Sequence, residues 1–253
     1  MKIKLTIEYD GGRFFGWQKQ SGLVSIQETI EKAIEKVFNL SETIDLHGAG
    51  RTDTGVHAIG QVAHFSILDD GLAEKWKADI LKLPIAINFY LIGIGVVVLS
   101  AEIVSETFHA RFSAKMRHYR YVMHNHRIKS VIYENRAWHI SRNLDESQMN
   151  EAAQSFLGTY NLNAFRSAHC NSENPIRTIS KIEVFREERF VIMKVAARSF
   201  LHNQVRIMVG TLAEIGIGKR PVKWIEHILE TQDRTKAGVT APPFGLYFMA
   251  VDY

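Results

Sequence analysis

The segment 83–101, LPIAINFYLIGIGVVVLSA, has no charged side chain over 19 residues, and it decides what kind of protein the chain can form. A helix that spans a bilayer needs about 20 apolar residues. Here Pro84, Asn88, Gly93 and Gly95 interrupt the apolar run. Isoleucine and valine dominate its second half, which is typical of a buried strand. We therefore expect a buried strand with a loop, and no membrane span.

Helical and extended patterns alternate along the rest of the chain. Residues 25–40 predict a helix, because apolar residues recur every three or four positions. Ser25 and Glu28 have the spacing of a capping box at its start. Two extended runs, 178–185 and 189–197, predict a hairpin, since only a short acidic turn separates them.

This mixture of helices and hairpins predicts an α+β fold, because hairpins favour antiparallel pairing. The 253 residues allow one large domain or two smaller ones. We expect two α+β subdomains, residues 1–107 and 108–253, with antiparallel or mixed sheets and helices on the outside.

The composition favours a reducing compartment. A lone cysteine, Cys170, excludes an internal disulfide framework. The first ten residues, MKIKLTIEYD, predict a strand and lack the apolar core of a signal peptide. We expect a cytoplasmic protein.

A glycine-rich stretch, GAGRTDTGVHA (48–58), places Asp53 close to Arg51 on a loop expected between two strands. Aspartate and glycine are common in turns, so a surface turn is one interpretation. A working carboxylate is the other. A neighbouring guanidinium keeps a carboxylate ionised even where burial would raise its pKa, and an ionised, desolvated carboxylate is a competent nucleophile. The spacing alone leaves both interpretations open.

Two other chemistries fit these residues poorly. The tripeptide Asp-Thr-Gly at 53–55 matches the core of an aspartic-protease motif, but such enzymes need two aspartates that share a proton. This chain has one such tripeptide, and an arginine lies two residues before it. His118, His124 and His126 lie on or just beyond one expected strand, yet no Cys-x-x-Cys or His-Glu-x-x-His pattern supports a metal site. We expect neither a protease nor a metal site.

The stretch 107–133 contains no Asp or Glu, whereas it has six Arg and Lys residues, four His residues and interspersed aromatic residues. Such a stretch suits a polyanion that also presents flat bases. A solvated basic face is the plainer alternative. Tyr119 and Tyr121 lie two positions apart on an expected strand and so share a face, where they could stack on a base or belong to the core.

Five ordered blocks of the sequence resemble the tRNA pseudouridine synthase A family. The stretch GAGRTDTGVHAIGQVAHF (48–65) is similar to the signature loop of that family. The other blocks, in chain order, are EYDGGRFFGWQKQ (8–20), FHARFSAKMRHYRYVMHN (108–125), SFLHNQVRIMVGTLAEIG (199–216) and APPFGLYFMAVDY (241–253). Together they are spread over nearly the whole chain. Residues 85–101 depart from the resemblance by being more apolar than expected.

The resemblance implies a pseudouridine synthase fold of two related subdomains with the catalytic cleft between them. It implies isomerisation of uridine to pseudouridine at positions 38–40, in the anticodon stem-loop of tRNA. The N-glycosidic bond breaks, the uracil turns, and the base rejoins the sugar through carbon 5. The resemblance also implies a homodimer that uses no metal and no organic cofactor. A catalytically silent tRNA-binding protein of the same fold is the alternative.

The resemblance also implies roles for four side chains. Asp53 matches the catalytic aspartate, the nucleophile, whether attack occurs at carbon 6 of the base or at carbon 1′ of the sugar, or the acid assists a glycal route. Tyr119 matches a tyrosine that stacks on the target uracil. Arg206 matches an arginine that pairs with the catalytic acid, and Arg51 matches a loop arginine that helps the base out of its stack.

Overall fold

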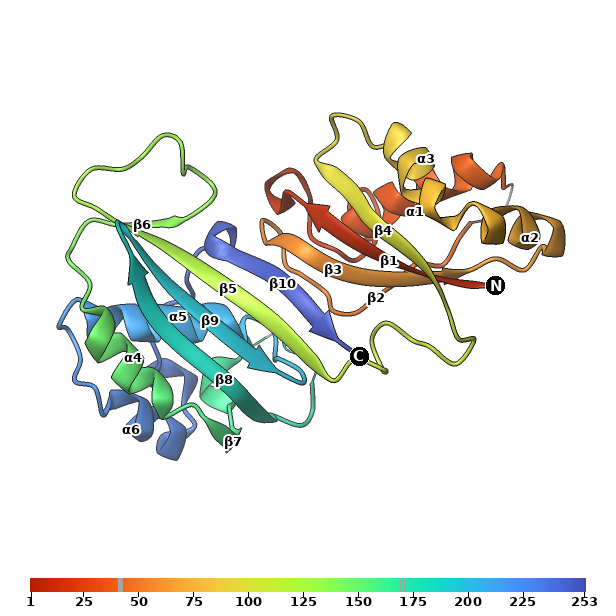
Figure 1. The fold of residues 1–253 in the computed structure, drawn as a ribbon. Helices are drawn as coiled ribbons and strands as arrows, with labels where there is room; N and C mark the ends of the chain where they lie inside the picture. The colour runs from red at the N-terminus through yellow and green to blue at the C-terminus, as the bar shows by residue number, and fades with distance from the viewer. Residues whose placement is uncertain (41–42, 169, 171) are drawn as a thin grey trace. The chain divides into compact units, whose positions relative to one another are not determined.

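The computed structural model describes residues 1–40, 43–168, 170 and 172–253. The chain divides into two compact units (Figure 1). The first unit comprises Met1–Lys115 together with Phe248–Tyr253, and the second comprises Met116–Tyr247. Both units combine strands with helices, so the predicted α+β class is confirmed.

The first unit is built on an antiparallel sheet in which β1 (Lys2–Tyr9) lies between β3 (His57–Ser66) and β4 (Val96–Val104). The short β2 (His47–Gly48) pairs with β3. The last strand, β10 (Leu246–Asp252), brings its residues 248–252 beside β3. This arrangement places both ends of the chain in the first unit.

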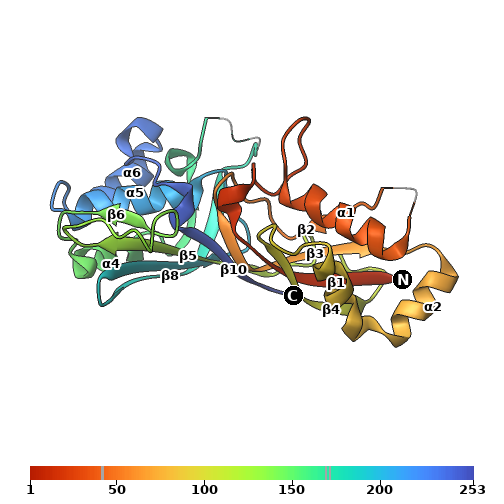
Figure 2. The ribbon, with the colours of Figure 1, turned by 90° about the horizontal axis from the view of Figure 1, so that it is seen from above.

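Helix α1 (Ile26–Phe38) runs along one face of this sheet (Figure 2). Ser25 caps it as predicted, because the Ser25 hydroxyl accepts from the Glu28 N–H at 3.2 Å. The helix ends at Asn39 in the left-handed conformation, with φ 51°. The predicted apolar stripe is buried, and its last member, Phe38, packs edge-on against Phe65 of β3 at 6.0 Å between ring centres.

The expectation for segment 83–101 is half wrong. Its first part forms helix α3 (Leu83–Phe89), and only its end joins strand β4. Pro84 lies in the first turn of α3, where a missing N–H costs no helical hydrogen bond. Asn88 explains the polar interruption: its side-chain amide donates to the Val98 carbonyl at 2.9 Å and accepts from the Val98 N–H at 2.7 Å. The helix is thereby fastened to the strand.

The segment is also less buried than expected. The exposed fractions of Ile85, Phe89 and Ile92 are 72%, 69% and 77%. Helix α2 (Asp70–Ala78) precedes this segment and has no buried residue. Among the described residues, no helix has the length and apolar character needed to cross a membrane.

The second unit contains a meander in which β9 (Phe190–Ala197) lies between β5 (Met116–Asn125) and β8 (Ile176–Glu187). The hairpin predicted at 178–197 is confirmed, and Glu188 turns the chain with φ 51°. The sheet is extended by β7 (Gly158–Asn161), antiparallel to β8, and by β6 (Trp138–Ile140), parallel to β5.

Three helices complete the second unit: α4 (Glu146–Gln154), α5 (Gln204–Gly216) and α6 (Trp224–Thr231). Helix α5 is buried along most of its length and contacts α4. Pro221 lies just before α6, which begins at Trp224. Short 3-10 turns occur at Gly11–Arg13, Ile80–Lys82, Asn163–Phe165, Arg234–Lys236 and Pro243–Gly245.

Candidate active site

Asp53 lies on the loop between β2 and β3 and is half-buried. The loop turns sharply after it, because the Val56 N–H donates to the Asp53 carbonyl at 3.1 Å and Gly55 has φ +82°. The backbone therefore has the turn that the composition suggested. A surface turn alone would not explain the hydrogen bonds that hold Gly50 and Thr52, just before Asp53.

Thr52, the residue before Asp53, is fixed by both its side chain and its main chain. The Tyr9 hydroxyl and the Thr52 Oγ1 are 2.8 Å apart, and the Trp17 N–H donates to the Thr52 carbonyl at 3.0 Å. Two residues before Thr52, the Gly50 carbonyl accepts from the Gln61 side-chain amide at 2.8 Å. Burial raises the pKa of Tyr9 to about 12, so its phenol keeps its proton at neutral pH.

Two glycines of the N-terminal block allow this close packing. A Cβ atom on Gly11 would lie 1.9 Å from the Val56 carbonyl oxygen, so only glycine fits there. Gly16 has φ +86°, and a Cβ atom there would lie 2.8 Å from the Thr52 carbonyl oxygen. The block 8–20 is therefore the support of the Asp53 loop. The residue types alone did not indicate this role for Tyr9, Trp17 and the glycines. The available signal was that block 8–20 combines glycines with several aromatic residues.

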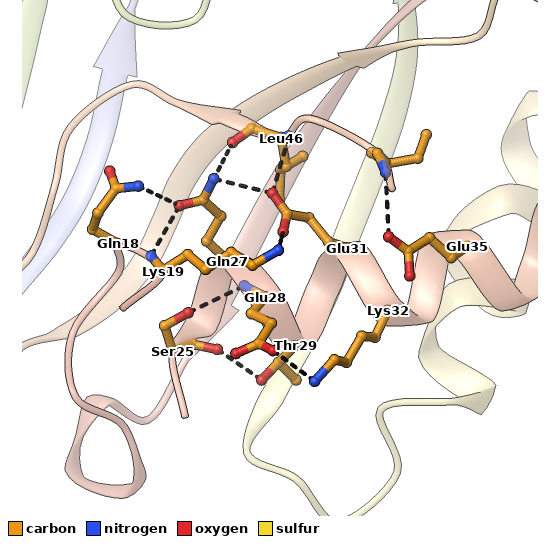
Figure 3. A network of polar contacts seen from close by, with 11 residues as sticks. Gln18, Lys19, Ser25, Gln27, Glu28, Thr29, Glu31, Lys32, Glu35 and Leu46 are labelled. Atoms are coloured by element: carbon orange, nitrogen blue, oxygen red, sulfur yellow. Dashed lines mark hydrogen bonds and ion pairs between the residues drawn. The ribbon is translucent and has the colours of Figure 1, made fainter. Parts of the chain in front are cut away.

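A buried polar network supports the same region from α1 (Figure 3). The Gln27 amide donates to a Glu31 carboxylate oxygen at 3.0 Å and to the Leu46 carbonyl at 3.1 Å. The Leu46 N–H donates to the same Glu31 oxygen at 3.3 Å, and the Lys19 ammonium lies 3.4 Å from the other. Helix α1 is thus tied both to the chain entering β2 and to the end of block 8–20.

Arg51 has an exposed side chain. That Arg51 keeps Asp53 ionised stays a prediction. An exposed guanidinium beside Asp53 suits contact with a ligand, which is the role that the resemblance implies for Arg51.

Two tyrosines of β5 differ in their surroundings. Tyr121 belongs to the core, since it is fully buried and its hydroxyl donates to the Pro242 carbonyl at 2.7 Å. Tyr119 is only half-buried, and its ring meets the Phe200 ring edge-on with 5.1 Å between centres. The edge contact fixes the plane of Tyr119. A fixed and accessible ring is what stacking on a base requires.

Arg206 lies in the first turn of α5 and is half-buried. Its Nε donates to the Ala241 carbonyl at 2.8 Å, and its Nη1 donates to the Asn203 side-chain oxygen at 2.6 Å. Asn203 adopts the left-handed conformation at the start of the helix, with φ 61°. These two contacts hold the guanidinium in one orientation.

The acid-free stretch 107–133 is not a uniform basic face. Arg117 is buried, and the Arg120 guanidinium lies over the Tyr247 ring, 5.2 Å from its centre. The other four basic side chains of the stretch, those of Arg111, Lys115, Arg127 and Lys129, are exposed. Among the described residues, no three His, Cys, Asp or Glu side chains are arranged as a metal ion would require.

Comparison with known proteins agrees with this arrangement over the whole chain. A family model described as tRNA pseudouridine synthase matches residues 5–86 and 152–253. A tRNA pseudouridine synthase A of Wolbachia pipientis subsp. Culex pipiens is 46% identical over 255 residues, with 100% of both chains covered. The protein of that name from Methylocella silvestris is 46% identical over 252 residues, covering 100% of this chain and 98% of its own. The chain therefore belongs to the tRNA pseudouridine synthase family.

Proposed function

We infer that the chain isomerises uridine to pseudouridine in tRNA. The observation that carries this conclusion is the full-length similarity to proteins of that activity, together with an Asp53 loop held by buried hydrogen bonds. A fixed loop suits catalysis, because a reacting group must be held within a narrow range of positions. The silent alternative would not need such a loop.

Asp53 is the nucleophile in this proposal. It attacks either the uracil or the ribose of the target nucleotide, the glycosidic bond breaks, and the detached uracil turns before it rejoins through carbon 5. A base within a stem must first leave its stack, at a cost of a few kcal/mol. Exposed Arg51 beside Asp53 offers a cation to the displaced strand.

The second unit supplies the remaining groups. Tyr119 stacks on the uracil, because its ring is accessible and its plane is fixed by Phe200. Arg206 pairs with the carboxylate of Asp53 and favours the ionised acid by charge pairing. The oriented guanidinium supports this role, since Asn203 and Ala241 fix it.

The substrate is the anticodon arm of tRNA, at positions 38–40, and the protein works as a cytoplasmic homodimer without an added cofactor. Large exposed apolar side chains on α3 and the turn after it support a protein partner, since such patches often mark interfaces. The exposed cations Arg111, Lys115, Arg127 and Lys129 support a polyanionic substrate.

Unmodified tRNA transcripts with a single uridine at position 38, 39 or 40 test this function. After incubation with the wild-type protein, pseudouridine is mapped at each position, and matched transcripts with cytidine at all three positions serve as controls. We expect product at those positions and none in the controls. Binding without product on every transcript would establish the silent alternative instead.

A further inference from the structure

A pair of buried hydroxyl groups, those of Tyr9 and Thr52, helps attach the Asp53 loop to the sheet. Tyr9 is the last residue of β1, and both side chains are buried: Tyr9 is 3% exposed and Thr52 is 7% exposed. Their oxygens lie 2.8 Å apart. Because β1 pairs with strands on both sides, Tyr9 cannot move without the sheet.

A third side chain joins this pair. The Gln61 amide lies 3.4 Å from the Tyr9 oxygen and can only donate to it. Between Tyr9 and Thr52, either hydroxyl can be the donor. Gln61 is fully buried on β3 and also holds the Gly50 carbonyl. Two sheet residues thus hold the loop at positions 50 and 52.

We propose that Tyr9 and Thr52 are positioning residues for the reaction, acting through the backbone of Asp53. This inference rests on the proposed role of Asp53. Thr52 is joined to Asp53 by one peptide bond, so a shift of Thr52 displaces the carboxylate. Displacement of a reacting group by about 1 Å costs about a hundredfold in rate. Loss of one of several attachments should cost about tenfold.

Substitutions that remove only a hydroxyl test the proposal. Tyr9→Phe and Thr52→Val each delete one partner while keeping the shape of the side chain, and Thr52→Ser keeps the hydroxyl. Tyr253→Phe is the matched control, because it deletes another phenol of the first unit, which donates to the Ala110 carbonyl at 2.9 Å rather than to Thr52. Single-turnover rates of pseudouridine formation and tRNA dissociation constants are measured for each.

We expect Tyr9→Phe and Thr52→Val each to lower the single-turnover rate about tenfold, with affinity for tRNA within about twofold of wild type. The double variant should be no slower than either single variant, because both changes break the same bond. Thr52→Ser should restore most of the rate, and Tyr253→Phe should match wild type. Wild-type rates for both single variants, or multiplied losses in the double variant, would overturn the proposal.

Amide hydrogen exchange provides a readout that does not depend on activity. The Val56 N–H closes the turn on Asp53, so its exchange reports how firmly the loop is held. Tyr9→Phe and Thr52→Val should speed its exchange about tenfold while amides of β8 and β9 stay unchanged. Unchanged exchange at Val56 refutes the anchoring, whereas a wild-type protein that forms no pseudouridine refutes the proposed function alone.

Discussion

Asp53 depends on uncharged neighbours for its position. The Tyr9 hydroxyl, the Gln61 amide and the Trp17 N–H each bond the segment from Gly50 to Thr52. All three groups are buried. Because a buried polar group without a hydrogen-bond partner costs free energy, displacement of the loop is unfavourable. At the residue scale, precision at the site comes from such neutral contacts.

His64 of β3 is a second residue whose surroundings determine its chemistry. It is 3% exposed, its Nδ1 accepts from the Ala110 N–H at 3.2 Å, and the rings of His47 and His109 lie 5.0 and 4.7 Å away. Burial first, and then the neighbouring histidines and Lys2, lower its pKa from 6.5 to about 4. The folded state therefore holds His64 neutral.

This lowered pKa predicts a loss of stability in acid. Between pH 6.5 and about 4, the unfolded chain binds the His64 proton more readily than the folded chain. The free energy of unfolding should therefore fall as pH falls through that window, by up to about 3 kcal/mol from this residue. Urea unfolding of wild type and of His64→Gln, each at pH 7 and pH 4.5, measures the effect.

His64→Gln should show a weaker pH dependence than wild type, because glutamine does not titrate. His227→Gln is the control, since His227 is exposed on α6. Equal pH dependence in wild type and His64→Gln would contradict the account.

The sequence suggested candidate catalytic residues, but it did not suggest which residues hold their loop in place. Tyr9 and Gln61 lie within blocks that resemble the family, but the resemblance assigned neither of them a role. Their importance depends on long-range contacts, across 43 residues from Tyr9 to Thr52 and 11 from Gly50 to Gln61. No local pattern encodes such contacts.

Helix α1 acts at the element scale by holding two segments together. Its buried Glu31 bonds the Leu46 N–H and the Gln27 amide, and it faces Lys19. Burial raises the pKa of Glu31 above its usual 4.5, while the bonds from Leu46 and Gln27 oppose the shift. Ionised Glu31 thus holds Leu46 and Gln27 together, but burying its charge costs some stability.

Removing this acceptor should destabilise the first unit. Glu31→Leu leaves the Leu46 N–H and the Gln27 amide without their acceptor, which costs about 1–3 kcal/mol in the free energy of unfolding. Glu28→Gln on the same helix is the control, because it breaks only the surface pair with Lys32 and should change stability little. Chemical denaturation at pH 7 compares them. Equal stability of Glu31→Leu and wild type would show that the Glu31 hydrogen bonds do not stabilise the first unit.

The raised pKa of Glu31 adds a prediction with the opposite sign to that of His64. The folded state keeps the Glu31 proton to higher pH than the unfolded state, so this contribution to stability is present below pH 4.5. It is lost as pH rises through the raised pKa. Glu31→Gln should remove this loss, and a pH series of unfolding free energies measures it. An unchanged series in Glu31→Gln would show that Glu31 does not titrate as described.

Element prediction succeeded where the local pattern was strong. Helix α1 has its cap, its apolar stripe and its end encoded within the helix and its flanking residues. Segment 83–101 failed because its apolar composition did not distinguish strand from helix. The bonds from Asn88 to Val98, which fasten α3 to β4, connect two elements and leave no periodic signature.

At the scale of the whole molecule, the net charge of +4 understates the attraction for RNA. Four side chains of the acid-free stretch, those of Arg111, Lys115, Arg127 and Lys129, are exposed cations, and Lys129 pairs with Glu134 at 2.6 Å. Each phosphate contact releases counterions, so binding of tRNA should weaken steeply with salt.

Salt titration of tRNA binding checks this attraction. Arg111→Gln should lower affinity for every tRNA alike and reduce the slope of log K against log salt by about 1. Lys219→Gln is the control, because Lys219 already pairs with Glu214 at 2.9 Å. Salt-independent binding, or equal slopes for wild type and Arg111→Gln, would place the RNA elsewhere on the protein.

The proposed homodimer predicts a molar mass in solution of about twice 28.8 kDa. Light scattering across a range of protein concentrations measures this directly. A mass of 28.8 kDa at all concentrations would leave the exposed apolar side chains of α3 without the proposed partner.

The central claim is that Asp53 performs the isomerisation. Its most direct test is the single-turnover rate of pseudouridine formation by Asp53→Asn on a tRNA transcript that wild type converts, with tRNA affinity measured alongside. Asparagine keeps the shape of the side chain but lacks the nucleophilic charge. We expect Asp53→Asn to form no detectable product and to bind tRNA with an affinity close to that of wild type. Product formed at a rate near that of wild type would contradict it.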